Sequence, residues 1–307
     1  MDLRQLAALV AVAEAGTFSG AATRLHTVQS NVSAHVARLE RELGATLVDR
    51  AAGQLTGEGE AVVARARRIQ TELDALVADV TSVRDEVAGT VRMGVIATTG
   101  RWLLPPLLGA VAAQHPKVRV TVLEGNTTSL VPQLVSGALD LAVVNLPIDD
   151  PDTAVEVLFE EDLVLVAPAA HVLAGNREIT LHELAEHPLL VPPPGTSIRV
   201  ELDRAAAAAG LVLRAQAELD GLRLIASLAF EGYGAAVLPA TAVPSRADGT
   251  WRSVAIAGVG RRRVGMARRR RGLPSAPARA LHDAIASVVN SQATAQGGVH
   301  APADPSS

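Results

Sequence analysis

The side chains with the clearest chemical purpose are hydrogen-bonding groups on residues 29–38. Glutamine can bond two adjacent sites on an adenine edge, serine serves a donor or an acceptor, and arginine binds phosphate. Between them, Val32, Val36, Leu39 and Leu43 recur at steps of four, three and four, which places them on one face of a helix. The pattern predicts a helix with one face in a protein core and other faces able to enter a DNA major groove. The candidate DNA-binding residues on it are Gln29, Ser30, Asn31, Ser33, His35 and Arg38.

A second, shorter helix must hold this one in place. Phe18, Ala21, Ala22 and Leu25 form an apolar stripe, and Thr17 stands before them as a side-chain cap for the first turn. The small Ala21 and Ala22 allow two helices to cross closely. The pair predicts a helix-turn-helix, although the bare pattern also fits a purely structural helical hairpin.

The surrounding residues are more specific. The block LRQLAALVAVAEAGTFSGAATRLHTVQSNVSAHVARLERELGATLVDR, followed by LTGEGE, resembles the winged helix-turn-helix of LysR-type transcriptional regulators. The resemblance continues more weakly to about residue 290. It implies that ATLVDR and LT are the strands of a wing. This wing departs from the family because Ala51, Ala52, Gly53 and Gln54 replace the basic residues common there, so its DNA contact falls mostly on Arg50.

Composition limits the alternatives. A chain of 307 residues can form two or three domains, and the absence of cysteine excludes disulfides, thiolate catalysis and cysteine-ligated zinc. We expect no membrane span, because no apolar stretch approaches about 20 residues, and no signal peptide, because Glu14 interrupts the apolar start. The expected location is the cytoplasm. The net charge of −4 says little about one small DNA-binding domain.

A long apolar seam follows the wing. Its positions recur at alternating steps of four and three with no break, which is typical of a helix that packs along a partner helix. A helix packed within one chain is the alternative, but no second helix carries a matching seam. The resemblance implies the same linker helix, which pairs two protomers in a homodimer and, we expect, a homotetramer. The seam comprises Val62, Ala66, Ile69, Leu73, Leu76, Val80, Val83 and Val87.

Beyond Gly89 strands and helices alternate, which predicts mostly parallel sheets flanked by helices. Two lobes, 89–160 with 263–290 and 161–262, match the effector domain of LysR-type regulators, which resembles type 2 periplasmic binding proteins. The predicted fold class is α/β overall, with a winged helix-turn-helix (1–58), a linker helix (59–88) and the effector domain (89–290). Residues 291–307 lack core-forming residues and are expected to be disordered.

Polar residues collect where the predicted strands end. In open α/β sheets, ligands bind beyond the carboxyl ends of strands, where helix N-termini offer free N–H groups. Helix capping explains each residue singly, and their convergence on one cleft between the lobes indicates a small-molecule site. A carboxylate ligand there would rely on backbone amides, on hydroxyls and on Arg101 and Arg199. The candidate effector-binding residues are Thr98, Thr99, Gly100, Asn126, Thr127, Asn145, Pro147, Thr196 and Ser197.

Other motifs carry less. The basic run from Arg261 to Arg271 could bind nucleic acid, but alternating charge favours an exposed edge strand protected against pairing. His182 and His187 are five residues apart, which does not suit a metalloprotease helix, and Gly232 and Gly234 lack the third glycine of a dinucleotide loop. We predict no catalytic residue, no metal and no cofactor.

The combined interpretation is a LysR-type regulator that binds double-stranded promoter DNA under the control of a small-molecule effector. The alternative from another class is a solute-binding protein with a helical N-terminal oligomerisation domain.

Overall fold

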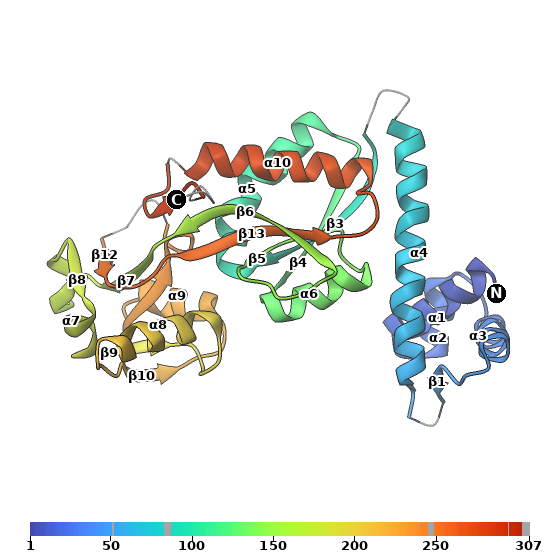
Figure 1. The fold of residues 1–307 in the computed structure, drawn as a ribbon, viewed down its shortest axis with the longest axis horizontal. Coiled ribbons are helices and arrows are strands. Elements are labelled where there is room, and N and C mark those ends of the chain that lie inside the picture. The colour runs from blue at the N-terminus through green and yellow to red at the C-terminus, as the bar shows by residue number, and fades with distance from the viewer. Residues whose placement is uncertain (51, 83–86, 245–248, 294, 303–307) are drawn as a thin grey trace.

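The computed structural model describes residues 1–50, 52–82, 87–244, 249–293 and 295–302. The N-terminal unit consists of three helices and a two-stranded wing (Figure 1). Its elements are α1 (Leu3–Ala15), α2 (Phe18–Arg24), α3 (Gln29–Leu43), β1 (Val48–Asp49) and β2 (Gln54–Leu55).

Local signals place the ends of these helices. Asp2 and Gln5 form a capping box on α1, and the Thr17 hydroxyl accepts from the Gly20 amide at the start of α2. Gly44 ends α3 in the left-handed conformation at φ 67°, which glycine adopts without steric cost. Val32, Val36 and Leu39 are fully buried, so three of the four predicted positions of the inner face are confirmed. Leu43, in the last turn of α3, is 43% exposed, and its assignment to that face is wrong.

The linker helix α4 (Gly57–Ser82) runs beside both parts of the molecule (Figure 1). Val63 and Ala66 enter the N-terminal core, whereas Ala75 and Ala78 are buried farther along the helix. The structure ends α4 at Ser82, earlier than the predicted seam. Val83 lies outside the described residues, and Val87 lies beyond the helix.

Lobe 1 is a six-stranded mixed sheet in the order β14-β6-β13-β5-β3-β4. Its strands β3, β4 and β5 are parallel, and β13 runs antiparallel to both β5 and β6. Helices α5 and α10 pack against one another, and α6 contacts β5 and α4. The elements are β3 (Gly89–Ile96), α5 (Ala97–Gln114), β4 (Val118–Gly125), α6 (Thr127–Ser136), β5 (Leu141–Asn145), β6 (Thr153–Glu161), β13 (Arg262–Arg269), α10 (Ala276–Ala293) and β14 (Val299–His300).

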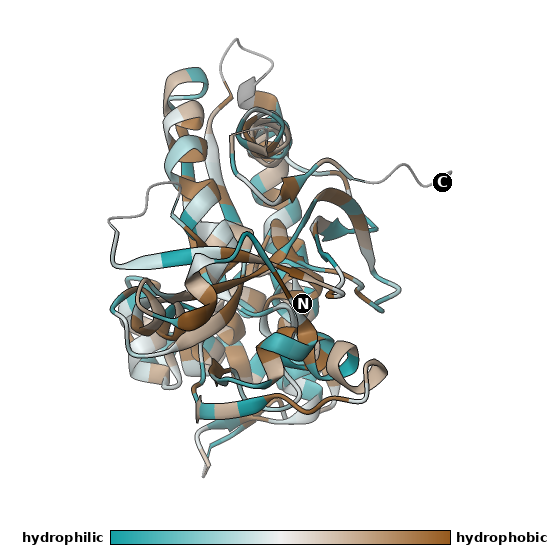
Figure 2. Ribbon diagram, turned by 90° about the vertical axis from the view of Figure 1, so that its left-hand side faces the viewer, coloured by the Kyte–Doolittle hydropathy of each residue, from teal (hydrophilic) through white to brown (hydrophobic). Residues whose placement is uncertain are grey.

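Lobe 2 contains the second sheet, in the order β10-β9-β11-β7-β12-β8. Figure 2, viewed from the side of this lobe, shows the brown apolar residues gathered on the strands inside it. The chain crosses between the lobes at Asp162 and again over residues 258–261. The elements are β7 (Leu163–Pro168), η1 (Val172–Gly175), β8 (Glu178–Thr180), α7 (Leu181–Ala185), β9 (Pro188–Val191), α8 (Ser197–Ala208), β10 (Arg214–Glu218), α9 (Leu222–Phe230), β11 (Ala235–Pro239), η2 (Ala240–Ala242) and β12 (Trp251–Ala257).

The basic run is not an edge strand, so that prediction is wrong. Strand β13 lies inside the lobe 1 sheet, hydrogen-bonded on both sides, with four consecutive buried residues from Val264 to Ala267. Its arginines sit at the two ends of the strand, where Arg262 meets a buried carboxylate and Arg269 donates to backbone carbonyls. The charges therefore serve intramolecular contacts and do not protect an edge.

The C-terminal segment also differs from the prediction of disorder. Strand β14 pairs with β6, and the Gln296 amide donates to the carbonyls of Ala240 and Val243 at 2.9 and 3.1 Å. Backbone pairing and one buried side chain, Val299, order the segment although it lacks an apolar run. Residues 294 and 303–307 of the predicted tail lie outside the described residues.

Among the described residues, no single helix is long and apolar enough to cross a membrane. Within the same residues, α1 and α2 taken together have the length and apolar composition of a membrane span, but a bend of 115° separates them.

Candidate DNA-binding surface and effector cleft

The recognition helix α3 presents its polar residues to the exterior. Gln29, Ser30 and Asn31 are exposed in its first turn, Ser33 is half-buried, and Arg38 is exposed two turns along. Its first residue is Gln29, and the preceding Val28 provides no side-chain cap. Two short contacts hold the first turn instead, from Ser19 Oγ to Gln29 Oε1 at 3.3 Å and from Asn31 Nδ2 to Thr27 Oγ1 at 3.0 Å. These contacts orient the two side-chain amides, and both residues remain exposed.

His35 lies on a different side of α3 from Gln29 and Ser33. Successive helix residues are rotated by about 100°, which turns His35 well away from both. It faces the start of α1, where the Gln5 backbone amide and, to a smaller extent, His35 lower the pKa of Asp2. The structure therefore brings Gln29 and Ser33 together and separates His35 from them.

Arg50, at the end of the wing strand β1, reaches back to α3. Its guanidinium donates to Ser33 Oγ at 3.3 Å and lies 5.4 Å above the ring of Phe18. Glu40 Oε2 is 3.9 Å away. Arg50 and Ser33 thus form one surface next to the exposed first turn of α3.

The apolar seam of α4 divides into a buried and an exposed part. Ala66 is fully buried, and Val62 is half-buried against the N-terminal core. In contrast, Ile69, Leu73, Leu76 and Val80 are 39%, 40%, 60% and 59% exposed in the single chain. A continuous row of exposed aliphatic side chains on a long helix is the arrangement expected of a surface that pairs with another copy.

The first group of predicted effector residues lies in the first turn of α5. Thr98 and Thr99 are buried, and Thr98 Oγ1 accepts from Arg262 at 3.0 Å. Thr99 Oγ1 has no hydrogen-bond partner, and a Cβ at Gly100 would meet Val95 at 3.2 Å. Gly100 therefore serves the packing of α5, whereas Thr98 lies at the junction between the lobes.

The second group forms a polar bridge between the lobes. Asn126 caps α6 by accepting from the Ser129 amide, and Thr127 Oγ1 accepts from the Asn145 amide at 3.1 Å. Asn145 Nδ2 then donates across the cleft to Ser197 Oγ of lobe 2 at 3.3 Å. Asn145 Oδ1 is buried without a partner.

The remaining two residues are peripheral to this bridge. Thr196 Oγ1 donates to the Pro193 carbonyl at 2.9 Å, and Pro147 is exposed after a cis peptide bond. Along the chain, Thr196 directly precedes Ser197, and Pro147 follows Asn145 by two positions.

A cavity of about 400 Å³ lies between the first turn of α5 and helix α9 of lobe 2. Thr98 is the one residue of the predicted set that lines it. That α9 lines this cavity was not predicted from the sequence. The signal that could have indicated it is the interruption of the apolar run LRLIASLAF by Arg223 and Ser227. The lining residues are Ala97, Thr98, Arg101, Arg223, Ala226, Ser227, Phe230, Glu231 and Ala242.

The two arginines predicted to meet a carboxylate ligand differ in availability. Arg199 is occupied, because it pairs with Asp203 at 2.9 Å and with Glu218 at 3.1 Å. Arg101 instead lies exposed on the cavity, 5.8 Å above the ring of Phe230. Arg223 also lines the cavity and pairs across the lobes with Glu124 at 2.7 Å. Arg101 is thus the guanidinium best placed to receive an anionic group.

A buried ion pair sits at the hinge, where β6 and β13 leave lobe 1. Glu161 is fully buried and accepts from Arg262 Nε at 2.8 Å, from Arg262 Nη2 and from the Thr241 amide at 2.9 Å. Arg262 continues to Thr98, so the hinge is connected to the cavity. The sequence gives no specific signal for this ion pair, because acidic residues such as Glu161 commonly precede an apolar strand.

No cluster of three or more histidine, aspartate or glutamate side chains could hold a metal ion within the described part of the chain.

Known proteins match the whole length of this architecture. A family model described as a bacterial regulatory helix-turn-helix protein of the lysR family matches residues 3–60, and a LysR substrate binding domain model matches residues 84–290. A probable hydrogen peroxide-inducible genes activator from Streptomyces viridosporus is 35% identical over 247 residues, covering 79% of this chain and 78% of that protein.

Two OxyR proteins cover still more of the chain. The transcriptional dual regulator OxyR of Escherichia coli K12 is 29% identical over 303 residues, covering 95% of this chain and 96% of its own length. A solved structure of full-length OxyR from Pseudomonas aeruginosa, a cysteine-substituted variant, is 26% identical, has a TM-score of 0.79 and covers 99% of each chain.

Proposed function

Because the chain belongs to the LysR family of bacterial transcriptional regulators, it binds promoter DNA under the control of a small-molecule effector, and we propose how its residues divide this work. The proposed units are the winged helix-turn-helix of residues 1–58, the linker of 59–88 and the effector domain of 89–290. We propose that it acts in the cytoplasm, through binding and without catalysis.

Base readout is assigned to the first turns of α3. Gln29 and Ser33 lie one turn apart on the same side of the helix, and Ser30 and Asn31 are exposed in the same first turn as Gln29. Arg50 joins this surface through Ser33. Arg38, farther along the helix, is assigned to phosphate, and His35 takes a lesser part because it faces α1.

The exposed seam of α4 is assigned to pairing between two protomers. Leu73 and Leu76 are its central residues. Two recognition helices held by one dimer can bind two half-sites, which compensates for the few basic residues of each N-terminal unit.

The cleft between the lobes is assigned to the effector. The cavity between α5 and α9 offers the Thr98 and Ser227 hydroxyls, the Arg101 guanidinium and the ring of Phe230 below it, whereas the Asn145–Ser197 bridge joins the lobes outside this cavity. This combination suits a small organic anion with an apolar part.

Hydrogen peroxide acting on a thiol is not the proposed signal, although the Streptomyces relative is named for induction by hydrogen peroxide. This chain contains no cysteine. Of its three methionines, Met93 and Met266 in the effector domain are buried, and the exposed Met1 lies in the N-terminal unit, where its amino group pairs with Glu42. Reversible sulfur oxidation depends on exposed, reactive sulfur. The effector is therefore proposed to bind without covalent chemistry.

The observation that carries the proposal is the exposed polar first turn of α3 on a helix whose Val32, Val36 and Leu39 are fully buried. The test begins with a gel shift on the DNA upstream of the chain's own gene, with and without competitor DNA. Peroxide is then added, and we expect operator affinity to remain unchanged.

Two variants separate base readout from phosphate binding. Gln29→Ala is expected to cost about 1–3 kcal/mol on the operator and to relax the preference at one base pair of each half-site. Arg38→Ala is expected to weaken operator and scrambled duplexes equally and to flatten the salt dependence. Titrations of both variants on both duplexes across salt concentrations decide between these roles. Equal weakening of the two duplexes by Gln29→Ala contradicts its assignment to base readout.

A further inference from the structure

Helix α6 begins at the effector cleft. Asn126 caps its N-terminus, and Thr127 in its first turn accepts from the backbone amide of Asn145. The Asn145 side chain donates to Ser197 of lobe 2. A movement of lobe 2 relative to lobe 1 therefore acts, through two hydrogen bonds, on the first turn of α6.

The other end of α6 contacts the linker helix α4. Arg68 Nε donates to the Val135 carbonyl at 2.9 Å, and Thr71 Oγ1, which also contacts the Arg67 carbonyl, lies 3.1 Å from the Gly137 carbonyl. We call these two interhelical contacts the α6 latch. They satisfy carbonyl groups that lack partners at a helix end, where the helix dipole also favours a cation.

Gly137 makes this close approach possible. It caps α6 at φ 83°, and a Cβ there would lie 3.4 Å from Arg68 Cγ and 3.5 Å from its Cα. The backbone of α6 thus lies directly against α4.

The same stretch of α4 also holds the DNA-binding unit. Arg67, the residue before Arg68, approaches Glu14 of α1 at 3.8 Å, and Ala66 is fully buried in the N-terminal core. Adjacent residues of α4 therefore contact the DNA-binding unit on one side and α6 on the other.

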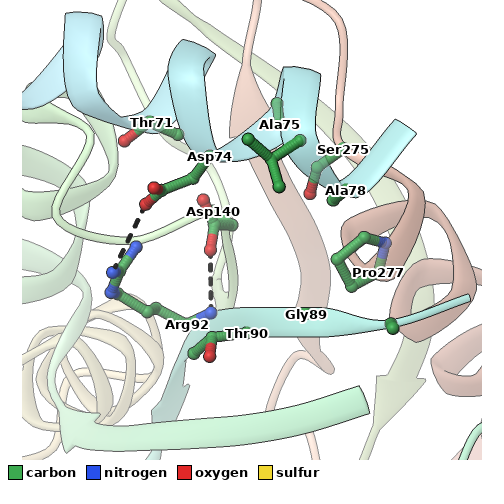
Figure 3. Close-up of a pocket in the computed structure, with 12 residues that line it drawn as sticks. Thr71, Asp74, Ala75, Ala78, Gly89, Thr90, Arg92, Asp140, Ser275 and Pro277 are labelled. Atoms are coloured by element: carbon green, nitrogen blue, oxygen red, sulfur yellow. Dashed lines mark hydrogen bonds and ion pairs between the residues drawn. The ribbon is translucent and has the colours of Figure 1, made fainter. Parts of the chain in front are cut away.

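Farther along α4, a cavity of about 410 Å³ lies between this helix and lobe 1. It is lined by Asp74 and Ala75 of α4 and by Arg92 and Asp140 of lobe 1, and one polar contact bridges it, with Asp74 Oδ2 3.9 Å from Arg92 Nη2 (Figure 3). Beyond it, Asp79 Oδ1 accepts from the Ala276 amide and from Arg279, both at 3.1 Å. A few polar contacts around a cavity can separate and re-form more readily than a continuous apolar interface.

We propose that α6 transmits movement of the effector cleft to the DNA-binding unit by way of the α6 latch. At about 1.5 Å per residue, its 10 residues span about 15 Å between the two sites. Closing or opening of the lobes shifts α6 along or around its axis, and Arg68 and Thr71 carry this shift to α4. The inference rests on the proposed function, because it explains how an occupied cleft alters operator binding.

The test imposes the lobe contact chemically, because the effector is unidentified. Because the chain has no cysteine, the double substitution Asn145→Cys with Ser197→Cys introduces a single pair of reactive thiols, one on each lobe. A short bifunctional methanethiosulfonate reagent locks the lobes, and dithiothreitol releases them. Operator affinity is measured by fluorescence anisotropy in both states, on a duplex selected by the wild-type chain from a random pool.

Four backgrounds are compared. Locking is expected to change operator affinity by about fivefold or more in the parent. The change should disappear with Arg68→Met and Thr71→Val, which remove the donors and keep similar volumes. It should persist with Arg65→Met, a control at an exposed position of the same helix. Thr71→Val alone, the mildest change, should reduce it in part and serves as the second arm if the double variant melts early.

Two results would overturn the inference. One is an equal change on locking in all backgrounds, and the other is no change on locking in the parent. Failure of the wild-type chain to select any duplex counts against the proposed function instead.

Discussion

Removal of the Arg262 side chain should cost far more stability than removal of its neighbour. Arg262→Met leaves Glu161, which is fully buried, with the Thr241 amide as its remaining donor in this site. Breaking one partner of a buried pair costs about 3–5 kcal/mol, because the other charge stays buried without compensation. Such a loss is a large share of the roughly 5–15 kcal/mol that stabilises a folded domain.

Arg261→Met is the matched control. Arg261 pairs with Asp162 at 2.9 Å, but the two side chains are 50% and 38% exposed. Solvent weakens such a pair, so its loss should cost at most about 1 kcal/mol. The two substitutions remove the same side chain from adjacent positions and differ chiefly in burial.

Urea unfolding followed by tryptophan fluorescence measures both costs. The chain has two tryptophans, Trp102 against Phe159 in lobe 1 and Trp251 against Phe230 in lobe 2, so the signal reports on the effector domain. Adding Glu161→Gln to Arg262→Met removes the stranded charge and should recover part of the stability. The reasoning is refuted if the Arg261 and Arg262 variants lose equal stability, or if Glu161→Gln recovers none.

Three further outcomes are expected. Charged residues at Leu73 and Leu76 should split the dimer in sedimentation and abolish tight DNA binding while the effector domain stays folded, because each leucine buried in a pair of helices is worth a few kcal/mol; an unchanged sedimentation coefficient contradicts this. Burial raises the pKa of Asp140 above its ordinary value of 3.8, so the folded state binds this proton more tightly than the unfolded state. The ionised Asp140 therefore lowers the free energy of unfolding at pH values above its ordinary pKa. Asp140→Asn should stabilise the protein at pH 7 but not at pH 3, as measured by urea titrations at both pH values. An equal effect at pH 7 and pH 3 would show that burial of the Asp140 charge is not what destabilises the protein. Arg101→Met should abolish the effector response in an operator titration and keep basal operator binding, and an unchanged response excludes Arg101 from the effector site.

The apolar periodicity and the capping residues of the sequence were sufficient to predict most helices and strands. The apolar steps of α3, the Thr17 cap and Gly44 lie within a few residues of one another, so local rules alone placed the helix-turn-helix correctly. Local rules failed for strand β13, because whether a charged strand lies at an edge depends on which strands pair with it. They failed again for β14, whose order comes from pairing with β6, about 140 residues earlier in the chain.

The candidate cleft shows the same division. The residue types at the strand ends were readable, and Asn145 and Ser197 meet across the lobes. Their partners were not readable, since Arg223 reaches Glu124 across a separation of 99 residues. Equally, nothing in the sequence distinguishes the occupied Arg199 from the available Arg101.

The sequence by itself determined the helix-turn-helix, the existence of a long linker helix, the alternating strands and helices, and the absence of thiol chemistry, because these depend on residue type and on spacing along one element. The tertiary structure alone decided which arginines are buried, which face of α4 stays exposed, and that α6 joins the cleft to the linker. Those features depend on contacts between elements that are far apart in the chain, and residue patterns within one element do not show which distant elements will lie beside it.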